Sequence, residues 1–196
     1  MTNPRTLKVG EQALIGDIIG HSFADDPVNQ WVFGGRECMT KYYTKMAKKL
    51  YLTKGFGHVT DDQTGGSLWL RPSDAKQVPL IKSIDIAFSM LRHNGFKSIL
   101  RGMGVDDGLA NKKPSEPHFY LFAIGSRPEH QGKGVGSIIM QAGLEIVDQA
   151  AMPAYLESSK ESNLPFYQRF GFEVTEKVVP AQGCPPLWLM WRPSRA

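Results

Sequence analysis

Long apolar runs are missing from this chain of 196 residues, and so is an apolar segment near its N-terminus. The longest apolar stretch, residues 119–124, is far shorter than the roughly twenty residues that a membrane-spanning helix needs. Residues 1–7 lack the apolar core of a secretory signal. The sequence therefore predicts no membrane partner and a cytoplasmic location.

Cysteine is nearly absent. Cys38 and Cys184 are the only two in the sequence, and neither has a second cysteine or a histidine beside it at metal-ligand spacing. This scarcity argues against a disulfide framework and against a zinc site, and it fits a reducing cytosol. We expect no metal ion.

A strong excess of positive charge is also missing, because the net charge is only +4. Much of the excess falls in residues 36–54, which could be a nucleic-acid-binding segment or a solvated helix face. Aromatic residues are not interleaved with basic ones in a nucleic-acid-binding pattern, so we favour the solvated face and predict no nucleic-acid partner. A basic rim could still attract a cofactor that carries phosphate groups.

The length and an ordinary composition, 41% hydrophobic and 21% charged, predict a single domain over residues 1–196. In the first half, apolar spacing predicts a helix from Glu11 to about Asp25, ended by Pro27, and a second helix from about Arg36 to Leu52. Strands are predicted at 7–9 and, as a hairpin, at 55–60 and 67–70.

Residues 72–117 carry the weakest pattern. Segments 84–91 and 96–100 have helical character, whereas 102–117 is rich in Gly, Lys, Asp and Pro, which predicts a loop. Such a loop is either a surface insertion or a mobile wall of a substrate site.

The C-terminal part is clearer. Residues 119–124 are nearly all apolar, as in a central strand covered on both faces. An amphipathic helix should follow from about 135 to 147, then a strand at 154–157 and a short helix that Asn163 can cap and Gly171 ends. Segments 172–179 and 187–191 predict a closing antiparallel pair. This order of elements predicts a mixed α/β fold.

Between the 119–124 strand and the amphipathic helix lies a glycine-rich turn, Arg127-Pro-Glu-His-Gln131-Gly-Lys-Gly134-Val-Gly136-Ser137. Clustered glycines let backbone N–H groups approach a ligand closely, and a helix N-terminus adds further donors, which together favour a phosphate or pyrophosphate. The spacing differs from a P-loop, because Gly134 and not Ser or Thr follows Lys133, and from a dinucleotide fingerprint. A turn without a ligand is the remaining alternative.

This turn resembles the Gln/Arg-x-x-Gly-x-Gly/Ala signature of the GCN5-related N-acetyltransferase (GNAT) superfamily. The resemblance continues through Leu156-Glu157-Ser158 and the run from Asn163 to Phe172, and residues 118–191 are similar to the branch that includes puromycin N-acetyltransferase. It implies an α/β GNAT fold, with a central mixed and mostly antiparallel sheet of six to seven strands flanked by helices. It also implies acetyl-CoA as the co-substrate.

The resemblance further implies which residues hold acetyl-CoA. The pantetheine arm should pair with the end of the central strand, as an added strand would; these residues are Ile124, Gly125 and Ser126. Asn163 should contact the arm near the sulfur. The pyrophosphate should lie on the turn formed by Gln131, Gly132, Lys133, Gly134, Val135, Gly136 and Ser137.

Two residues are candidates for proton transfer. Tyr167 stands where many family members place the acid that protonates the departing thiolate, and a tyrosine with an ordinary pKa of about 10 can donate to a thiolate whose conjugate acid lies near ~8.5. Its alternative role is a core tyrosine. Glu157 could accept the ammonium proton directly or through water, and its alternative role is a structural carboxylate.

The acceptor is less well defined. Asp26 and Trp31, with neighbouring Asp25 and Phe33, could form an acidic and aromatic wall for a cationic amine. His118 opens the central strand and is a further candidate substrate residue, with a pKa range suited to a base; its alternative role is a surface histidine. We predict direct acetyl transfer to a primary amine of a small molecule. A non-catalytic acyl-CoA-binding or sensing domain and a protein N-terminal or lysine acetyltransferase remain alternatives. A homodimer is compatible with the sequence, which does not determine the oligomeric state.

Overall fold

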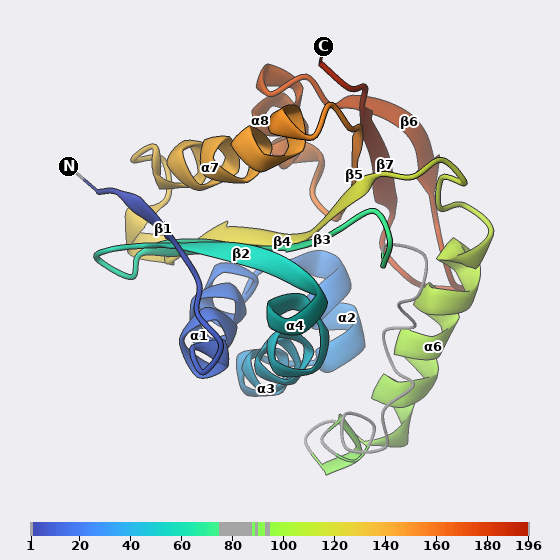
Figure 1. The fold of residues 1–196 in the computed structure, drawn as a ribbon. Helices are drawn as coiled ribbons and strands as arrows, with labels where there is room; N and C mark the ends of the chain where they lie inside the picture. The colour runs from blue at the N-terminus through green and yellow to red at the C-terminus, as the bar shows by residue number, and fades with distance from the viewer. Residues whose placement is uncertain (1, 75–87, 89, 93–94, 196) are drawn as a thin grey trace.

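A seven-stranded sheet with helices on both faces organises the chain (Figure 1). The computed structural model describes residues 2–74, 88, 90–92 and 95–195. The strand order is β1-β2-β3-β4-β5-β7-β6, and among the described strands β4 and β5 are the parallel pair. The strands are β1 (Pro4–Thr6), β2 (Gly55–Thr60), β3 (Gly65–Leu70), β4 (Phe119–Ser126), β5 (Ala154–Ser158), β6 (Glu173–Val178) and β7 (Leu187–Arg192). This confirms the predicted α/β GNAT fold class.

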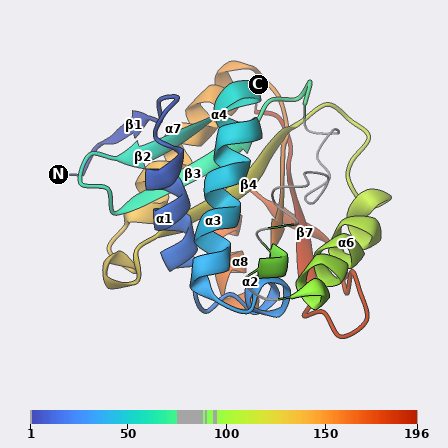
Figure 2. The ribbon, with the colours of Figure 1, turned by 90° about the horizontal axis from the view of Figure 1, so that it is seen from below.

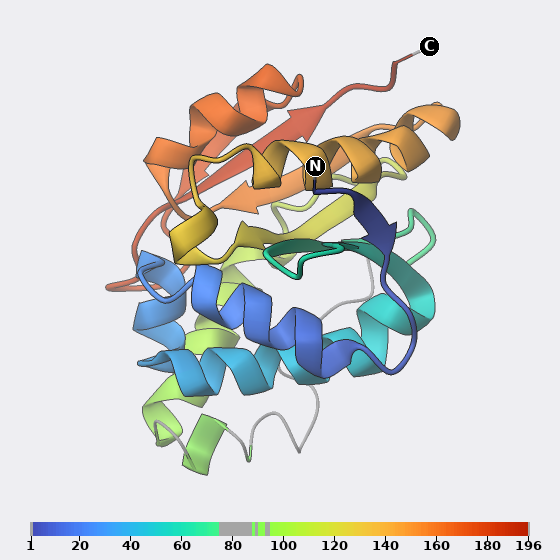
Figure 3. The same ribbon diagram turned by 90° about the vertical axis from the view of Figure 1, so that its left-hand side faces the viewer.

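The helices divide between the two faces of the sheet. α1, α2, α3 and α4 lie below it and α7 and α8 above it in Figure 1, and Figure 3 shows the same separation from the side. The helical segments are α1 (Gln12–Ser22), α2 (Pro27–Phe33), α3 (Arg36–Met46), a π-helical turn η1 (Ala47–Tyr51), α4 (Leu52–Lys54), α6 (Phe96–Ala110), η2 (Pro128–His130), α7 (Val135–Gln149), η3 (Glu161–Asn163) and α8 (Leu164–Arg169).

α1 and α3 run side by side beneath the sheet (Figure 2). Glycines on α1 allow this close packing, because a Cβ at Gly16 would lie 2.0 Å from Thr44 Oγ1 and one at Gly20 would lie 2.1 Å from Thr40 Oγ1.

The described residues form two apolar cores, one on each face of the sheet. One joins α1–α3 to the lower face of the sheet, and the other joins α7 and α8 to the upper face.

The central strand β4 carries a β-bulge. Leu68 of β3 pairs with Ala123 and the next residue, Trp69, pairs with Leu121, so Phe122 is the extra residue. Leu121 and Ile124 pack on the α7 side, whereas Tyr120, Phe122 and Ala123 pack on the α1–α3 side. The bulge therefore adds one aromatic ring to the lower face.

β4 and β5 separate towards their C-terminal ends. Their pairing runs from Phe119 opposite Ala154 to Leu121 opposite Leu156 and does not include the remaining residues of either strand. The end of β4 then pairs with β3 alone, through Ser126 opposite Gly65. One edge of β4 beyond Leu121 is thus left open on the β5 side.

Several predicted boundaries are wrong. The first strand is Pro4–Thr6 rather than 7–9, and the helix beginning near Glu11 ends at Ser22, before Asp25. Asp26 does not lie at the C-terminal end of the first helix: it is the N-cap of α2, a helix that the sequence patterns did not predict. Residues 102–110 are helical and belong to α6, although a loop was predicted there.

Most of the remaining predicted elements agree with the structure or lie outside the described residues, although the side chain of Asn163 makes no capping hydrogen bond to the short helix. The hairpin strands, the helix after the glycine turn, the strand at 154–157, the short helix before Gly171 and the closing antiparallel pair are all present. Most of the predicted helical segment 84–91 lies outside the described residues. Within the described part of the chain, no helix is long and apolar enough to cross a membrane.

Candidate active site

A cavity of about 690 Å³ opens where β4 and β5 separate. Its lining comes from the end of α1, from α2, α3 and α6, from β4 and β5, from the turn before α7, and from α8. Nine residues predicted as cofactor contacts line it: Ile124, Gly125, Ser126, Gln131, Gly132, Gly134, Gly136, Ser137 and Asn163. Glu157, Tyr167 and Asp26 line it as well.

The glycine turn leads directly into α7. Gly132 and Gly134 have positive φ angles of 74° and 85°, a conformation that other residues adopt rarely. Gly134 occupies the N-cap position without a side chain, so the first N–H groups of α7 have no capping side chain as their acceptor. This combination of exposed N–H groups and the positive end of the helix dipole suits an anion.

Two predicted cofactor residues in this turn do not line the cavity. Lys133 is exposed, and Val135 is buried at the first position of α7. Val135 packs against β3, because a Cβ on Gly65 would lie 2.4 Å from Val135 Cγ1. Val135 therefore anchors the turn to the sheet.

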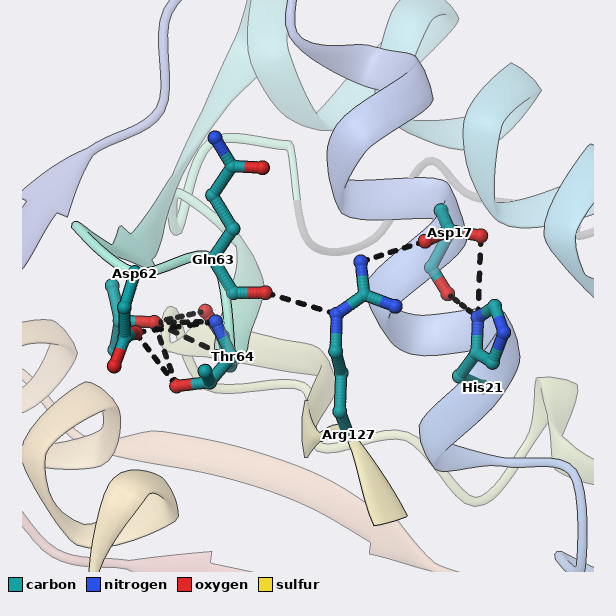
Figure 4. A network of polar contacts seen from close by, with 8 residues as sticks. Asp17, His21, Asp62, Gln63, Thr64 and Arg127 are labelled. Carbon is teal, nitrogen blue, oxygen red and sulfur yellow. Dashed lines mark hydrogen bonds and ion pairs between the residues drawn. The ribbon is translucent and has the colours of Figure 1, made fainter. Parts of the chain in front are cut away.

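A polar network fixes the start of the turn (Figure 4). Arg127, the residue after β4, donates to Asp17 Oδ2 on α1 at 2.7 Å and to the Gln63 carbonyl at 3.1 Å. The same Asp17 contacts His21 Nδ1 through Oδ1 at 3.2 Å. The network joins α1, the β2–β3 turn and the end of β4, so it holds three segments around the glycine turn.

The β2–β3 turn is itself hydrogen-bonded. Asp62 accepts from Thr64 Oγ1 at 2.7 Å and from Thr2 Oγ1 at 2.8 Å. Burial alone would raise the pKa of Asp62, but the hydrogen bonds from Thr64, Thr60 and Thr2 outweigh it and hold the pKa well below its usual range. The carboxylate therefore stays charged, and the turn keeps its shape, over the physiological pH range.

The open end of β4 lies against α1. A Cβ on Gly125 would lie 2.1 Å from Ser22 Oγ, so glycine is required for this approach. Ile124, Gly125 and Ser126 form the end of β4, where β5 no longer pairs with it. An extended ligand can reach this edge from the cavity.

Tyr167 lies on α8 and is 9% exposed. Its ring packs edge-on against Phe166 and Phe172, with centroid distances of 5.2 and 6.2 Å. Burial, with a smaller contribution from the charge of Asp26, raises the pKa of Tyr167. Its hydroxyl is therefore protonated at neutral pH and can donate a hydrogen bond.

Glu157 lies on β5, just beyond the last residue paired with β4. Its Oε2 accepts a hydrogen bond from Tyr120 Oη at 2.5 Å. Its Oε1 is buried and has no hydrogen-bond partner among the described residues. A buried carboxylate oxygen with an unused lone pair, at the wall of a cavity, can accept a proton from a bound group.

Asp26 lines the cavity, but its oxygens are already engaged. Oδ1 accepts from the backbone N–H and the side chain of Asn29, each at 2.8 Å, and Oδ2 accepts from Ser159 Oγ. The carboxylate is 3% exposed and caps α2, which favours negative charge at that helix end. Asp26 thus contributes negative charge to the cavity from a structural position.

Trp31 and His118 do not line this cavity. Trp31 lies beside a separate surface hollow with Arg101, whose guanidinium is 4.7 Å from its ring centroid. His118 is 2% exposed and packs against Tyr155 and Trp191, with ring centroids 5.5 and 5.6 Å away. The structure therefore separates both residues from the other predicted site residues.

The sequence patterns did not single out Tyr120, Phe122 or Ser159, which line the cavity beside the predicted residues. Tyr120 and Phe122 could have been found from the two-residue alternation of a strand that ends at the glycine turn. The position of Ser159 against Asp26 depends on two segments that are 133 residues apart in the sequence. No local pattern predicts such a contact.

Residues 87–172 match the model of the acetyltransferase (GNAT) family. An uncharacterized N-acetyltransferase of Schizosaccharomyces pombe is 27% identical over 177 residues, which cover 80% of this chain and 68% of that protein. A Corynebacterium glutamicum structure described as histone acetyltransferase HPA2 and related acetyltransferase has a TM-score of 0.74 at 20% identity, covering 100% of this chain and 97% of that one.

A further solved structure is PaiA N-acetyltransferase from Thermoplasma acidophilum in complex with coenzyme A. Its TM-score is 0.55 at 12% identity, covering 98% of this chain and 99% of that one. The family model and the Schizosaccharomyces pombe relative support an acetyltransferase of the GNAT superfamily. The two solved structures share the fold of this chain. The puromycin branch stays a prediction.

Proposed function

We propose that this protein transfers an acetyl group from acetyl-CoA to a primary amine of a small molecule. The observation that carries the proposal is a single cavity that is lined by the glycine turn, the open edge of β4, Tyr167 and Glu157. Binding donors, a proton donor and a proton acceptor thus face one continuous space.

The cofactor half of the cavity fits acetyl-CoA. The turn offers backbone N–H groups for the pyrophosphate, and the open edge of β4 offers backbone groups that an amide-containing arm can pair with. Lys160 and Arg169 also line the cavity and add positive charge. Asn163 begins α8 without using its side chain as a cap, which leaves its amide available to the arm.

Starting from an ammonium, the chemistry removes two protons from the nitrogen and supplies one to the sulfur. Acetyl-CoA supplies an activated thioester when it is bound. In our proposal Glu157 accepts a proton from the ammonium of the acceptor, the amine nitrogen forms a bond to the acetyl carbon, and the bond from that carbon to sulfur breaks. Tyr167 donates its proton to the departing thiolate. The acetylated nitrogen loses its second proton through water to the tyrosinate, and Glu157 releases the first proton to solvent, so charge and protons balance.

The alternatives differ in what they require of the site. An acyl-CoA sensor needs the cofactor half of the cavity but not Glu157 or Tyr167, whose positions on the cavity wall favour an enzyme. A protein acetyltransferase needs room for a peptide on both sides of the reacting lysine or N-terminus. α2 and α6 line the same cavity as Glu157, which favours a small acceptor.

A thiol-release assay with acetyl-CoA tests the proposal. The panel contains small primary amines, polyamines, aminonucleosides and peptides, and product mass identifies the acetylated species. We expect thiol release with small primary amines. Tight acetyl-CoA binding without turnover on any amine would favour the sensor, and turnover on peptides alone would favour the protein acetyltransferase.

A further inference from the structure

Beyond the edge of β4, the cavity has an end that no acetyl-CoA contact explains. Aromatic side chains form one side of it, from α2, α3 and β4, and we call this set the aromatic wall: Phe33, Tyr42, Tyr43, Tyr120 and Phe122. A second side comes from α6 through Gly102, Val105 and Leu109.

The aromatic wall is continuous. Phe33 and Tyr42 have ring centroids 4.6 Å apart, and Tyr42 and Tyr43 have centroids 5.2 Å apart. Phe122 lies 5.6 Å from Tyr43 and 6.3 Å from Tyr120, which places Tyr120 at the Glu157 end of the wall. The β-bulge in β4 turns Phe122 to this side. The wall therefore leads from an apolar interior to a carboxylate.

The α6 side is held in place by its neighbours. Arg101 donates to the Trp31 carbonyl of α2 at 2.7 Å, and Ser98 donates to the Val32 carbonyl. On the other flank, a Cβ on Gly108 would lie 2.0 Å from the Pro180 carbonyl oxygen. Because α6 packs closely on both sides, Val105 and Leu109 form a fixed apolar surface opposite the aromatic wall.

Both carboxylates of the cavity lining, Asp26 and Glu157, are buried or half-buried acids, and the lining also holds two cations, Lys160 and Arg169. Lys160 is already paired with Asp25 at 2.6 Å. Lys113 lies 5.4 Å from the centroid of the Tyr120 ring but is not among the lining residues. A cation is thus favoured beside Glu157, whereas the α6 residues in the lining, Gly102, Val105 and Leu109, carry no carboxylate; Asp106 of α6 is not a lining residue.

We infer that the acceptor is a monoamine with an aromatic body. Its ammonium lies beside Glu157, and its ring lies between the aromatic wall and Val105 and Leu109. Aromatic rings gain from edge and offset contacts with one another, and a second ammonium against α6 would lose its hydration without compensation. This inference rests on the proposed function, and it excludes polyamines as preferred acceptors.

The test measures kcat/KM by thiol release for 2-phenylethylamine, butylamine, spermidine and a lysine-containing peptide. We expect 2-phenylethylamine to exceed butylamine and spermidine by about tenfold or more, because burial of the ring adds to the shared amine contact. A preference for spermidine or the peptide would overturn the inference and leave acetyl transfer intact. Absence of turnover on every amine would overturn the proposed function and the inference together.

Two variants of α6 localise the ring. Val105→Phe narrows the cavity and should lower kcat/KM for 2-phenylethylamine at least about tenfold. It should change the value for butylamine much less. Leu109→Ala widens the cavity and should raise the ratio of kcat/KM for 1-naphthylmethylamine over that for 2-phenylethylamine. Met103→Phe, on the exposed side of α6, is the matched control and should change neither ratio.

Melting temperatures show whether each variant folds. If Val105→Phe does not fold, the widening by Leu109→Ala decides the matter alone. Equal effects of Val105→Phe on 2-phenylethylamine and butylamine, or no effect of Leu109→Ala on the ratio, would place the ring elsewhere and overturn the inference.

Discussion

Tyr120 of β4 donates a 2.5 Å hydrogen bond to Glu157 of β5, just where the two parallel strands separate. The bond occupies one carboxylate oxygen and leaves Oε1 without a partner among the described residues. Burial, followed by the charge of Glu157, raises the pKa of Tyr120 well above its ordinary value. Tyr120 therefore stays protonated and positions the carboxylate that we propose as the base.

Replacing Glu157 by Gln tests that role. Glutamine keeps an oxygen that can accept from Tyr120 but cannot take up a proton at neutral pH. We expect kcat to fall about 10²–10⁴-fold, with the Kd for acetyl-CoA unchanged. Glu161→Gln, at an exposed carboxylate on η3, is the matched control and should keep wild-type turnover. Near-wild-type turnover of Glu157→Gln would reject Glu157 as the base.

Tyr167→Phe removes one hydroxyl and keeps the ring contacts with Phe166 and Phe172. If Tyr167 protonates the thiolate, steady-state kinetics should show kcat lowered about 10²–10⁴-fold, while calorimetry shows an unchanged Kd for acetyl-CoA. A fully active Tyr167→Phe enzyme would mean that Tyr167 only packs α8.

Gly136→Asp tests the pyrophosphate site. A Cβ at Gly136 would lie 3.5 Å from Phe166, so the position has room for a side chain, and its φ is not positive. The added carboxylate should weaken acetyl-CoA binding roughly 10–100-fold by repelling the pyrophosphate. Gly35→Asp, at the N-cap of α3 with nothing within 4 Å of its Cβ, is the control. Equal calorimetric affinities of both variants would exclude this turn as the site.

All six tyrosines of the chain have pKa values raised mainly by burial. Above pH 10 the unfolded chain releases their protons while the folded chain holds them, so the free energy of unfolding must fall as pH rises. The loss is about 1.4 kcal/mol per pH unit for each tyrosine. Urea unfolding between pH 9 and 11 should show this steep decline. Stability that is independent of pH in that window would contradict the burial of these hydroxyls.

The sequence predicted the parts of the fold that local patterns encode. Residues 119–124 are uniformly apolar and flanked by a glycine turn, so the central strand and the following helix were both found. The part of α6 beyond residue 100 was missed because Gly102, Gly104 and Gly108 resemble loop residues, whereas Gly108 serves close packing against Pro180. α2 was missed because Pro27 was interpreted as the end of a helix, although Asp26 followed by Pro27 is equally the start of one.

The candidate site, like the fold, was predicted where local patterns encode it and missed where distant segments meet. Contacts within one turn, such as Gln131 to Ser137, follow from spacing. The environment of Asp26 depends on Ser159, and the location of His118 depends on Trp191 of β7, so both required the folded sheet. Trp31 faces Arg101 of α6, a helix that was not predicted beyond residue 100.

The central claim is that one cavity binds acetyl-CoA and passes its acetyl group to a small amine. The most direct measurement is mass spectrometry of the products formed from acetyl-CoA with a deuterated acetyl group and 2-phenylethylamine, with free thiol measured in parallel. Our account predicts labelled N-acetyl product and free coenzyme A in equal amounts, both strongly reduced in Tyr167→Phe. Bound but unreacted acetyl-CoA, with no labelled product from any amine of the panel, would contradict it.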